Sequence, residues 1–134
     1  MKIEHVAVWI KDLVTMRDFY MKYFSATSNE LYSSTRRPFW SYFLTFESGA
    51  RLELMMEPGR DHSTTCGLTG LAHIAFSVGS RASVDALTDR LRKDGIRVTS
   101  DPRTTGDGYY ESTILDPEGN TLEITADADF AAVT

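Results

Sequence analysis

The sequence predicts an α+β fold in which two repeated βαβββ modules form a curved, mostly antiparallel sheet cleft with the helices outside. The first reason is an internal repeat: residues 71–76 (Leu-Ala-His-Ile-Ala-Phe) share the alternation and the lone histidine of residues 3–8 (Ile-Glu-His-Val-Ala-Val). The second is that both copies close alike, on Arg-Leu-Glu-Leu-Met at 51–55 and on Thr-Leu-Glu-Ile-Thr at 121–125. Such repetition is typical of a duplicated structural unit. Because a half of about 60 residues buries too little surface to be stable alone, we expect the halves to share a core or a sheet.

The first module begins with a strand, because residues 2–10 alternate between two faces. Asp12 is a suitable N-cap, and the apolar and aromatic residues that follow it at helical spacing predict a helix of about three turns over one sheet face. The rest of the module is predicted as a short strand (27–32), a loop (33–38) and a hairpin whose strands (39–46 and 51–57) are joined by a turn (47–50).

The second module repeats this order, beginning with a strand at 71–78. Ser80 is the expected N-cap of its helix, and Gly95 stands where a helix end needs a residue free to adopt positive φ. The remaining elements are predicted as a short strand (96–99), a polar loop (101–108), a strand (109–115), a tight turn (116–120) and the closing strand (121–125).

The chain is predicted to be a single domain whose two modules are joined by a linker. The linker is rich in Pro, Gly, Ser and Thr, which are loop-forming residues. It contains His62, expected to be a solvated loop histidine because the second copy has no counterpart, and Cys66, the only cysteine and an expected spectator thiol. The predicted boundaries are module one at 1–57, the linker at 58–69, module two at 70–126 and a C-terminal tail at 127–134.

The composition argues against nucleic acid and membranes as partners. A formal charge of −5 and a pI near 5.1 argue against a general binder of nucleic acid, which needs clustered Lys and Arg. No apolar run approaches the ~20 residues that cross a bilayer, so no membrane is expected as a partner. Strand-like sequence begins close to Met1 without a charged and then apolar leader, which predicts a cytoplasmic location.

Two histidines and two glutamates occupy equivalent positions in the copies. His5 and His73 have the strand parity that can face the cleft, while the alternate apolar residues pack under the helices. Glu53 and Glu123 are flanked by apolar residues whose burial sends both carboxylates to the same open side. Each of the four, taken singly, is readily explained as a satisfied polar strand residue; their duplication favours metal binding. If the sheets curl together, two imidazoles and two carboxylates form a set suited to a divalent first-row ion with open water positions.

These features identify a family resemblance. With His opening and Glu closing each half, and with the run Leu-Asp-Pro-Glu-Gly-Asn-Thr-Leu-Glu at 115–123, nearly the whole chain resembles the vicinal oxygen chelate superfamily of glyoxalases, bleomycin resistance proteins and dioxygenases. The His, Glu, His, Glu set resembles short bacterial-type glyoxalase I, a lactoylglutathione lyase. The resemblance implies a homodimer that binds Ni²⁺ or Co²⁺, with Zn²⁺ as a further option, through His5, Glu53, His73 and Glu123.

The resemblance also implies a reaction. A glyoxalase I moves a proton between adjacent carbons of a hemithioacetal, formed from a 2-oxoaldehyde and a thiol, through an enediolate whose charge a divalent cation stabilises. Glu123 would be the leading proton-transfer base, with Glu53 as its partner across the site.

The expected substrate-binding residues include departures from this family. Glyoxalase I enzymes that use glutathione usually have Arg four residues after the first His and commonly Asn four residues after the first Glu, where this chain has Trp9 and Glu57. Glu57 would repel an anionic tripeptide, so the sequence leaves the identity of the thiol open. Arg51 and the loop pair Arg36–Arg37 are the candidates for a cationic clamp. The remaining predicted substrate contacts are Tyr109 and Tyr110, which end the glycine-containing run 103–110. This run could close over the substrate as a lid, or it could be a plain hairpin loop without such a role.

Three other functions fit the same superfamily. An extradiol-type dioxygenase would bind Fe²⁺ through His5, His73 and Glu123, although Glu53 would then occupy a position that oxygen or catechol needs. A metal-dependent transferase would add a thiol to an epoxide antibiotic. A metal-free resistance protein would hold a drug between aromatic residues such as Trp9, Trp40 and Tyr110. In a homodimer, each site can join the two copies within one chain or one copy from each of two chains. Both arrangements use the same residues, so the sequence does not distinguish them.

Overall fold

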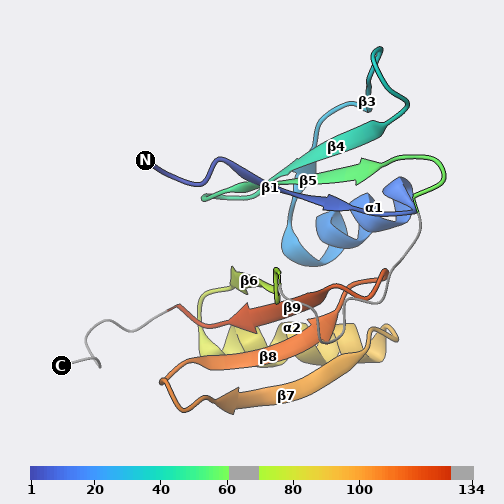
Figure 1. The fold of residues 1–134 in the computed structure, drawn as a ribbon. Coiled ribbons are helices and arrows are strands. Elements are labelled where there is room, and N and C mark those ends of the chain that lie inside the picture. The colour runs from blue at the N-terminus through green and yellow to red at the C-terminus, as the bar shows by residue number, and fades with distance from the viewer. Residues whose placement is uncertain (61–69, 128–134) are drawn as a thin grey trace. The chain divides into compact units, whose positions relative to one another are not determined.

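A computed structural model describes residues 1–60 and 70–127 of the chain (Figure 1). The chain divides into two compact units, Met1–Thr69 and Gly70–Thr134, and each is described by itself. Neither helix of the described part is long and apolar enough to cross a membrane. Outside the described residues lie 61–69 and 128–134, which include His62, Cys66, most of the predicted linker and nearly all of the predicted tail.

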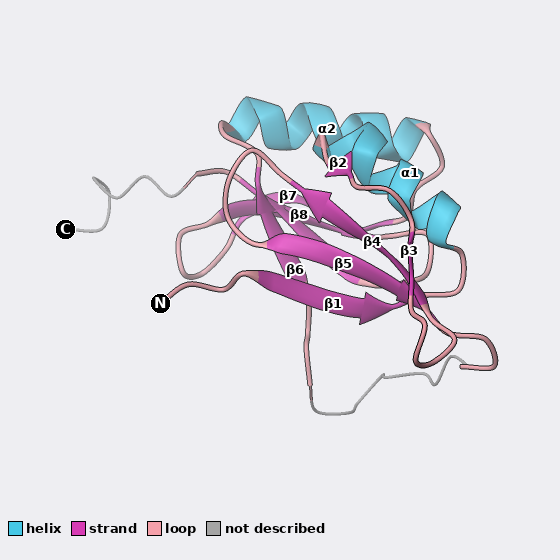
Figure 2. Cartoon of the chain, turned by 90° about the horizontal axis from the view of Figure 1, so that it is seen from above, coloured by secondary structure: helices cyan, strands magenta, loops and turns pink. Residues whose placement is uncertain are grey.

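The first unit is a five-stranded sheet with one helix. Its sheet order is β1-β5-β4-β2, and β3 pairs with β4. β1 is parallel to β5, whereas the other pairs are antiparallel. Helix α1 packs on β4 and β5, on one face of this sheet (Figure 2). The elements are β1 (His5–Trp9), α1 (Leu13–Phe24), β2 (Thr27–Ser28), β3 (Tyr32–Ser33), β4 (Trp40–Thr45) and β5 (Arg51–Met56).

The second unit repeats this plan with four strands in the order β6-β9-β8-β7. Its opening strand β6 is parallel to its closing strand β9, as β1 is to β5, and the other pairs are antiparallel. Helix α2 packs on β7, β8 and β9. The predicted α+β class, with two modules of mostly antiparallel sheet, is therefore confirmed. The elements are β6 (Ile74–Ser77), α2 (Arg81–Lys93), β7 (Val98–Thr104), β8 (Tyr110–Leu115) and β9 (Thr121–Thr125).

Both helices begin at the predicted caps. The Asp12 carboxylate accepts a hydrogen bond of 3.0 Å from the Thr15 N–H, and the Ser80 hydroxyl accepts one of 3.1 Å from the Ser83 N–H. Each cap satisfies a donor that the first helical turn cannot pair internally. Gly95, which follows the C-cap residue Asp94 of α2, adopts φ of +84°, as predicted for a helix end.

The predicted polar loop at 101–108 is wrong at its beginning, because β7 continues to Thr104. β7 is an edge strand with two register irregularities, so it tolerates polar residues and Pro102 that would be excluded from a central strand. The predicted strand at 27–32 is also wrong, since it divides into the two short strands β2 and β3.

The core of each unit lies between its helix and one face of its sheet. In the first unit Leu44, Leu52 and Leu54 are buried with Met16 and Tyr20 of α1. Because side chains alternate along a strand, burial of Leu52 and Leu54 turns the residues between and beside them to the opposite face. The corresponding core of the second unit consists of Val84, Leu91, Ile114, Leu122 and Ile124.

Candidate functional site

His5 and Glu53 lie on the face of the first sheet that α1 does not cover. In the parallel pairing of β1 with β5, Ala7 is opposite Glu53, and His5 is opposite Arg51. His5 therefore reaches Glu53 diagonally, with its Nε2 atom 3.9 Å from the Glu53 Oε1 atom. The Glu53 side chain is 13% exposed, which leaves it open to a ligand while its neighbours hold its position.

A ring of contacts holds the His5 imidazole. Its Nδ1 atom is 2.7 Å from the Glu4 carboxylate, which also pairs with the Arg51 guanidinium. The Arg51 guanidinium carbon lies 4.3 Å from the centre of the Phe43 ring. The Phe43 ring in turn contacts the His5 ring edge-on, with 5.3 Å between the ring centres. The hydrogen bonds from His5 and then Arg51 hold the pKa of the Glu4 carboxyl below its usual value, so Glu4 is an anion at neutral pH.

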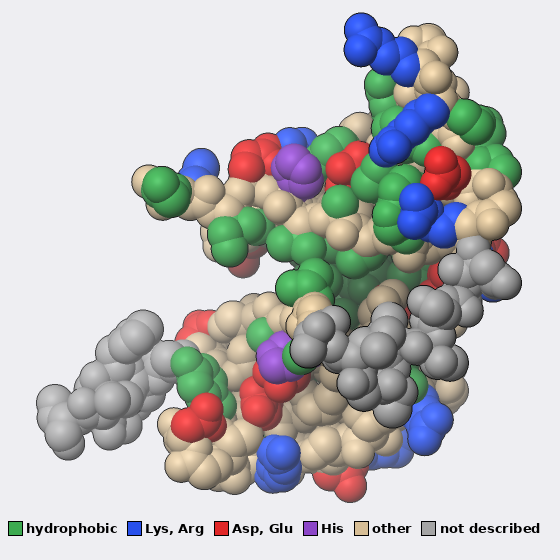
Figure 3. All heavy atoms as spheres, viewed as in Figure 1, with side chains coloured by type: hydrophobic (Ala, Val, Ile, Leu, Met, Phe, Trp, Pro, Cys, Tyr) green, Lys and Arg blue, Asp and Glu red, His purple; other side chains and the backbone are tan. Residues whose placement is uncertain are grey.

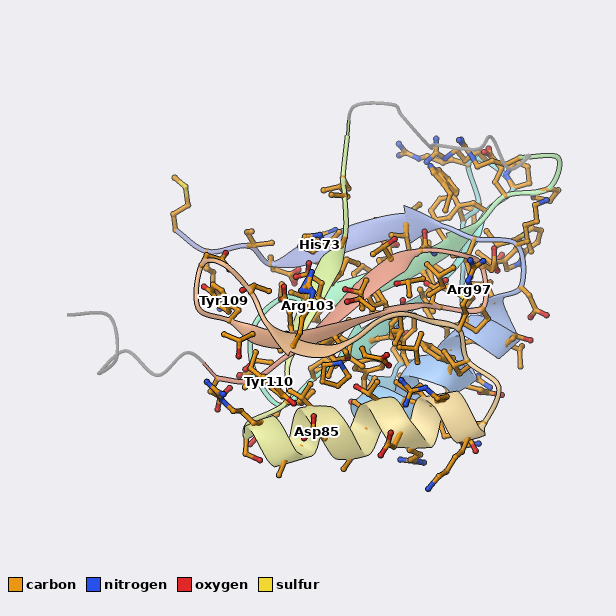
Figure 4. All side chains as sticks on the ribbon, turned by 90° about the horizontal axis from the view of Figure 1, so that it is seen from below. His73, Asp85, Arg97, Arg103, Tyr109 and Tyr110 are labelled. Carbon is orange, nitrogen blue, oxygen red and sulfur yellow. The ribbon has the colours of Figure 1, made fainter. Side chains whose placement is uncertain are left out.

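The second unit repeats the His–Glu pair. His73 immediately precedes β6, and its Nε2 atom is 3.2 Å from the Glu123 Oε2 atom. Ala75 is opposite Glu123 in the parallel pairing of β6 with β9, the same offset as between Ala7 and Glu53. Figure 4 shows His73 on the stretch that leads into β6. The duplicated sequence has thus produced a duplicated local geometry.

Glu111 of β8 is a site residue that the sequence interpretation missed. Thr113 is opposite Glu123, and Glu111 has the same strand parity as Thr113, so both carboxyl groups lie on one face. Burial, followed by the charge of Glu123 and a hydrogen bond with it, raises the pKa of the Glu111 carboxyl, while Arg103 opposes the shift. The tight turn before β9 fixes the register of this hairpin, so strand parity could have placed Glu111 beside Glu123 from the sequence.

The predicted substrate residue Trp9 belongs to a basic–aromatic cluster formed by Trp9, Arg37, Glu57 and Arg60. Trp9 has the same strand parity as His5, and the Arg60 guanidinium stacks 3.8 Å above its ring, with Arg37 at 6.0 Å. Glu57 accepts hydrogen bonds of 3.0 and 2.8 Å from Arg60, which neutralises its charge. Figure 3 shows Lys and Arg side chains among hydrophobic ones at one end of the first unit.

The predicted substrate residue Tyr110 contacts α2 and not the His73–Glu123 pair. The Tyr110 hydroxyl donates a hydrogen bond of 2.5 Å to Asp85 of α2, and Arg81 lies 5.0 Å above its ring (Figure 4). This bond raises the pKa of Tyr110. Tyr110 therefore lies on the helix side of β8, opposite to Glu111. Tyr109 is 45% exposed in the turn before β8.

The chemistry of each His–Glu pair fits part of a metal site. An ionised carboxylate only accepts hydrogen bonds, so the contact with Glu4 requires a proton on His5 Nδ1; in the neutral imidazole the electron pair is then on Nε2, on the side of Glu53. That is the form of imidazole that binds a divalent cation. Within residues 1–60 and 70–127 no group of three or more His, Cys, Asp or Glu residues forms a complete metal site; each unit supplies one imidazole and one carboxylate of the predicted four.

Known proteins resemble this chain in sequence and in structure. The family model described as the Glyoxalase/Bleomycin resistance protein/Dioxygenase superfamily matches residues 2–124. The Uncharacterized protein YqjT of Bacillus subtilis (strain 168) is 26% identical over 131 residues, covering 92% of this chain and 98% of its own length. A glyoxylase/bleomycin resistance protein/dioxygenase domain from Frankia sp. EAN1pec superimposes with a TM-score of 0.81 at 20% identity, covering 94% of this chain and 97% of its own. Lactoylglutathione lyase from Agrobacterium tumefaciens superimposes with a TM-score of 0.67 at 23% identity, covering 93% and 92%. At these identities the two structures establish a shared fold.

Proposed function

Because the chain belongs to the glyoxalase/bleomycin resistance protein/dioxygenase superfamily, we propose that it is a metal-dependent lyase of the glyoxalase I type that acts on the hemithioacetal of a 2-oxoaldehyde and a thiol. The observation that carries this proposal is the repeated His–Glu pair. Each pair lies on the sheet face opposite its helix, with the same cross-strand offset in both units. A single polar strand residue needs no function, but a duplicated imidazole–carboxylate pair supplies four of the ligands that a divalent first-row ion takes.

In this proposal His5, Glu53, His73 and Glu123 hold Ni²⁺ or Co²⁺, with Zn²⁺ as a further option. When bound, the ion supplies Lewis-acid stabilisation of the negative charge that develops on the substrate oxygens of the enediolate. Glu123 takes the proton from one substrate carbon and returns it to the adjacent carbon, and Glu53 is its partner. The enzyme is proposed to be a homodimer, as the family resemblance implies.

The direct test begins with the metal content of untagged protein purified without chelators, measured by mass spectrometry. The apoprotein is then reloaded separately with Ni²⁺, Co²⁺, Zn²⁺ and Fe²⁺ and assayed with methylglyoxal and several thiols. We expect stoichiometric binding of a divalent ion and lyase activity restored by Ni²⁺ or Co²⁺. Oxygen uptake with catechols after anaerobic Fe²⁺ loading would instead establish a dioxygenase. Protein that binds no metal would contradict the proposal and favour a drug-binding protein.

The basic–aromatic cluster supports an anionic thiol as the cosubstrate. Arg37 and Arg60 bring two positive charges to Trp9, and Glu57 supplies one negative charge. The repulsion expected from Glu57 is thus offset by Arg60, and the cluster retains a positive balance. Glutathione is therefore a candidate cosubstrate, even though Trp9 and Glu57 depart from the pattern of the glutathione-using enzymes.

Replacing Arg37 or Arg60 by Ala is expected to raise KM for glutathione adducts by about tenfold, because loss of a hydrogen bond to a charged group costs about 1.5 kcal/mol. KM for the adduct of an uncharged thiol should change far less. Steady-state kinetics on both adducts give the comparison, and Lys93→Ala serves as the control because Lys93 is an exposed cation at the end of α2 with no proposed role in binding. Equal changes in KM for charged and uncharged thiols would rule out recognition of the anion by this cluster.

A further inference from the structure

The environment of His5 differs from that of its repeat partner His73. Glu4 precedes His5 and contacts its Nδ1 atom at 2.7 Å, whereas Ala72 precedes His73 and offers no side-chain acceptor. Arg51 is two residues before Glu53, whereas Thr121 is two residues before Glu123. The first unit therefore contains a charged pair, Glu4 and Arg51, that its duplicate lacks.

The position of Glu4 is determined by main-chain as well as side-chain contacts. The Arg51 backbone N–H donates a hydrogen bond of 2.9 Å to the Glu4 carbonyl oxygen, which joins the residue before β1 to the beginning of β5. The Arg51 guanidinium pairs with the Glu4 carboxylate and rests on the Phe43 ring. Arg51 was expected to bind substrate, but its charge is met by Glu4. Arg51 is therefore better placed to orient Glu4 than to bind an anionic substrate.

A neutral imidazole has two tautomers, and only one presents an electron pair at Nε2. A carboxylate that accepts from Nδ1 selects this tautomer and fixes the plane of the ring, and removing such a partner typically lowers metal affinity by about 10- to 100-fold. We propose that Glu4, held by Arg51, is a positioning residue that presents His5 Nε2 to a divalent cation on the Glu53 side. This inference rests on the proposed metal-dependent function.

The first experiment reads the tautomer without any metal. Long-range ¹H–¹⁵N NMR spectra of the apoprotein at a pH of about 8.5, where ordinary imidazoles are neutral, distinguish a protonated Nδ1 from a protonated Nε2. We expect His5 to carry its proton on Nδ1 in the wild type and to lose this preference in Glu4→Ala. His73 should be unchanged by the substitution and serves as an internal reference. A wild-type His5 protonated on Nε2 would overturn the proposal whatever the metal data show.

The second experiment measures the dissociation constants of Ni²⁺ and Zn²⁺ by competition with a chromophoric chelator. Glu4→Ala should weaken binding by about 10- to 100-fold, and Glu4→Gln should restore part of it because an amide oxygen still accepts from Nδ1. Glu47→Ala, in an exposed turn of the same unit, is the matched control and should bind as the wild type does. Circular dichroism of all variants checks that the fold is retained.

The outcomes separate the two proposals. If the wild type binds metal and Glu4→Ala binds it within about twofold of the same affinity, the role of Glu4 is refuted and the metal-dependent function stands. If the wild type binds neither ion, both are refuted. Weaker binding by Glu4→Ala with the predicted tautomer change establishes the positioning role even if no lyase activity is found.

Discussion

Replacing Glu123 by Gln is expected to lower kcat of the metal-loaded enzyme by about 10²- to 10⁴-fold, the usual contribution of a proton-transferring side chain. Gln keeps the shape of Glu and one oxygen that can face the ion, but it cannot accept the substrate proton. Glu123 lies on the face of the sheet opposite α2 with its side chain 20% exposed, so the substitution should leave the core of the unit intact.

Steady-state kinetics with metal analysis of each preparation will separate the two roles of Glu123. A variant that retains its ion and loses activity identifies Glu123 as the base, whereas loss of both identifies it chiefly as a ligand. Asp89→Asn, on the exposed surface of α2, is the control and should behave as the wild type. Full activity of Glu123→Gln on every accepted hemithioacetal would contradict the proposed reaction.

Replacing Leu54 by Ala is expected to lower the free energy of unfolding by about 2–5 kcal/mol, the range for removing a fully buried leucine side chain. Leu54 is completely buried in the layer between β5 and α1, and its burial turns Glu53 to the open face. Because small proteins are stable by only about 5–15 kcal/mol, this loss is a large fraction of the total.

Urea unfolding followed by circular dichroism gives this measurement, provided that the free energy of unfolding falls with urea concentration at the same slope in the wild type and the variant. The matched control is Val14→Ala, since Val14 is an apolar residue of α1 that is 52% exposed and whose replacement leaves no cavity. Equal stability of Leu54→Ala and Val14→Ala would show that the buried layer of the first unit is not as described.

Much of the fold could be predicted because it depends on local patterns. Alternation identified the opening and closing strands, and Asp12 and Ser80 marked the beginnings of both helices. At 101–108 the prediction failed because polar residues of an edge strand resemble loop sequence, and at 27–32 it failed because one predicted strand is divided into two short ones. Edge strands are stabilised by partners distant in the chain, so their residues need not show the strand pattern.

The candidate site, like the fold, was predictable from the sequence only in part. By its repeat and its strand parity, the sequence alone determined that His5, Glu53, His73 and Glu123 lie opposite the helices, because burial of alternate apolar residues leaves these side chains no other face. Only the tertiary structure decided which partners distant in the chain the charged groups meet: Arg51 pairs with Glu4, and Arg60 stacks on Trp9. These partnerships depend on cross-strand register and on the course of connecting segments, which are set by long-range pairing, and no local period of the sequence encodes them.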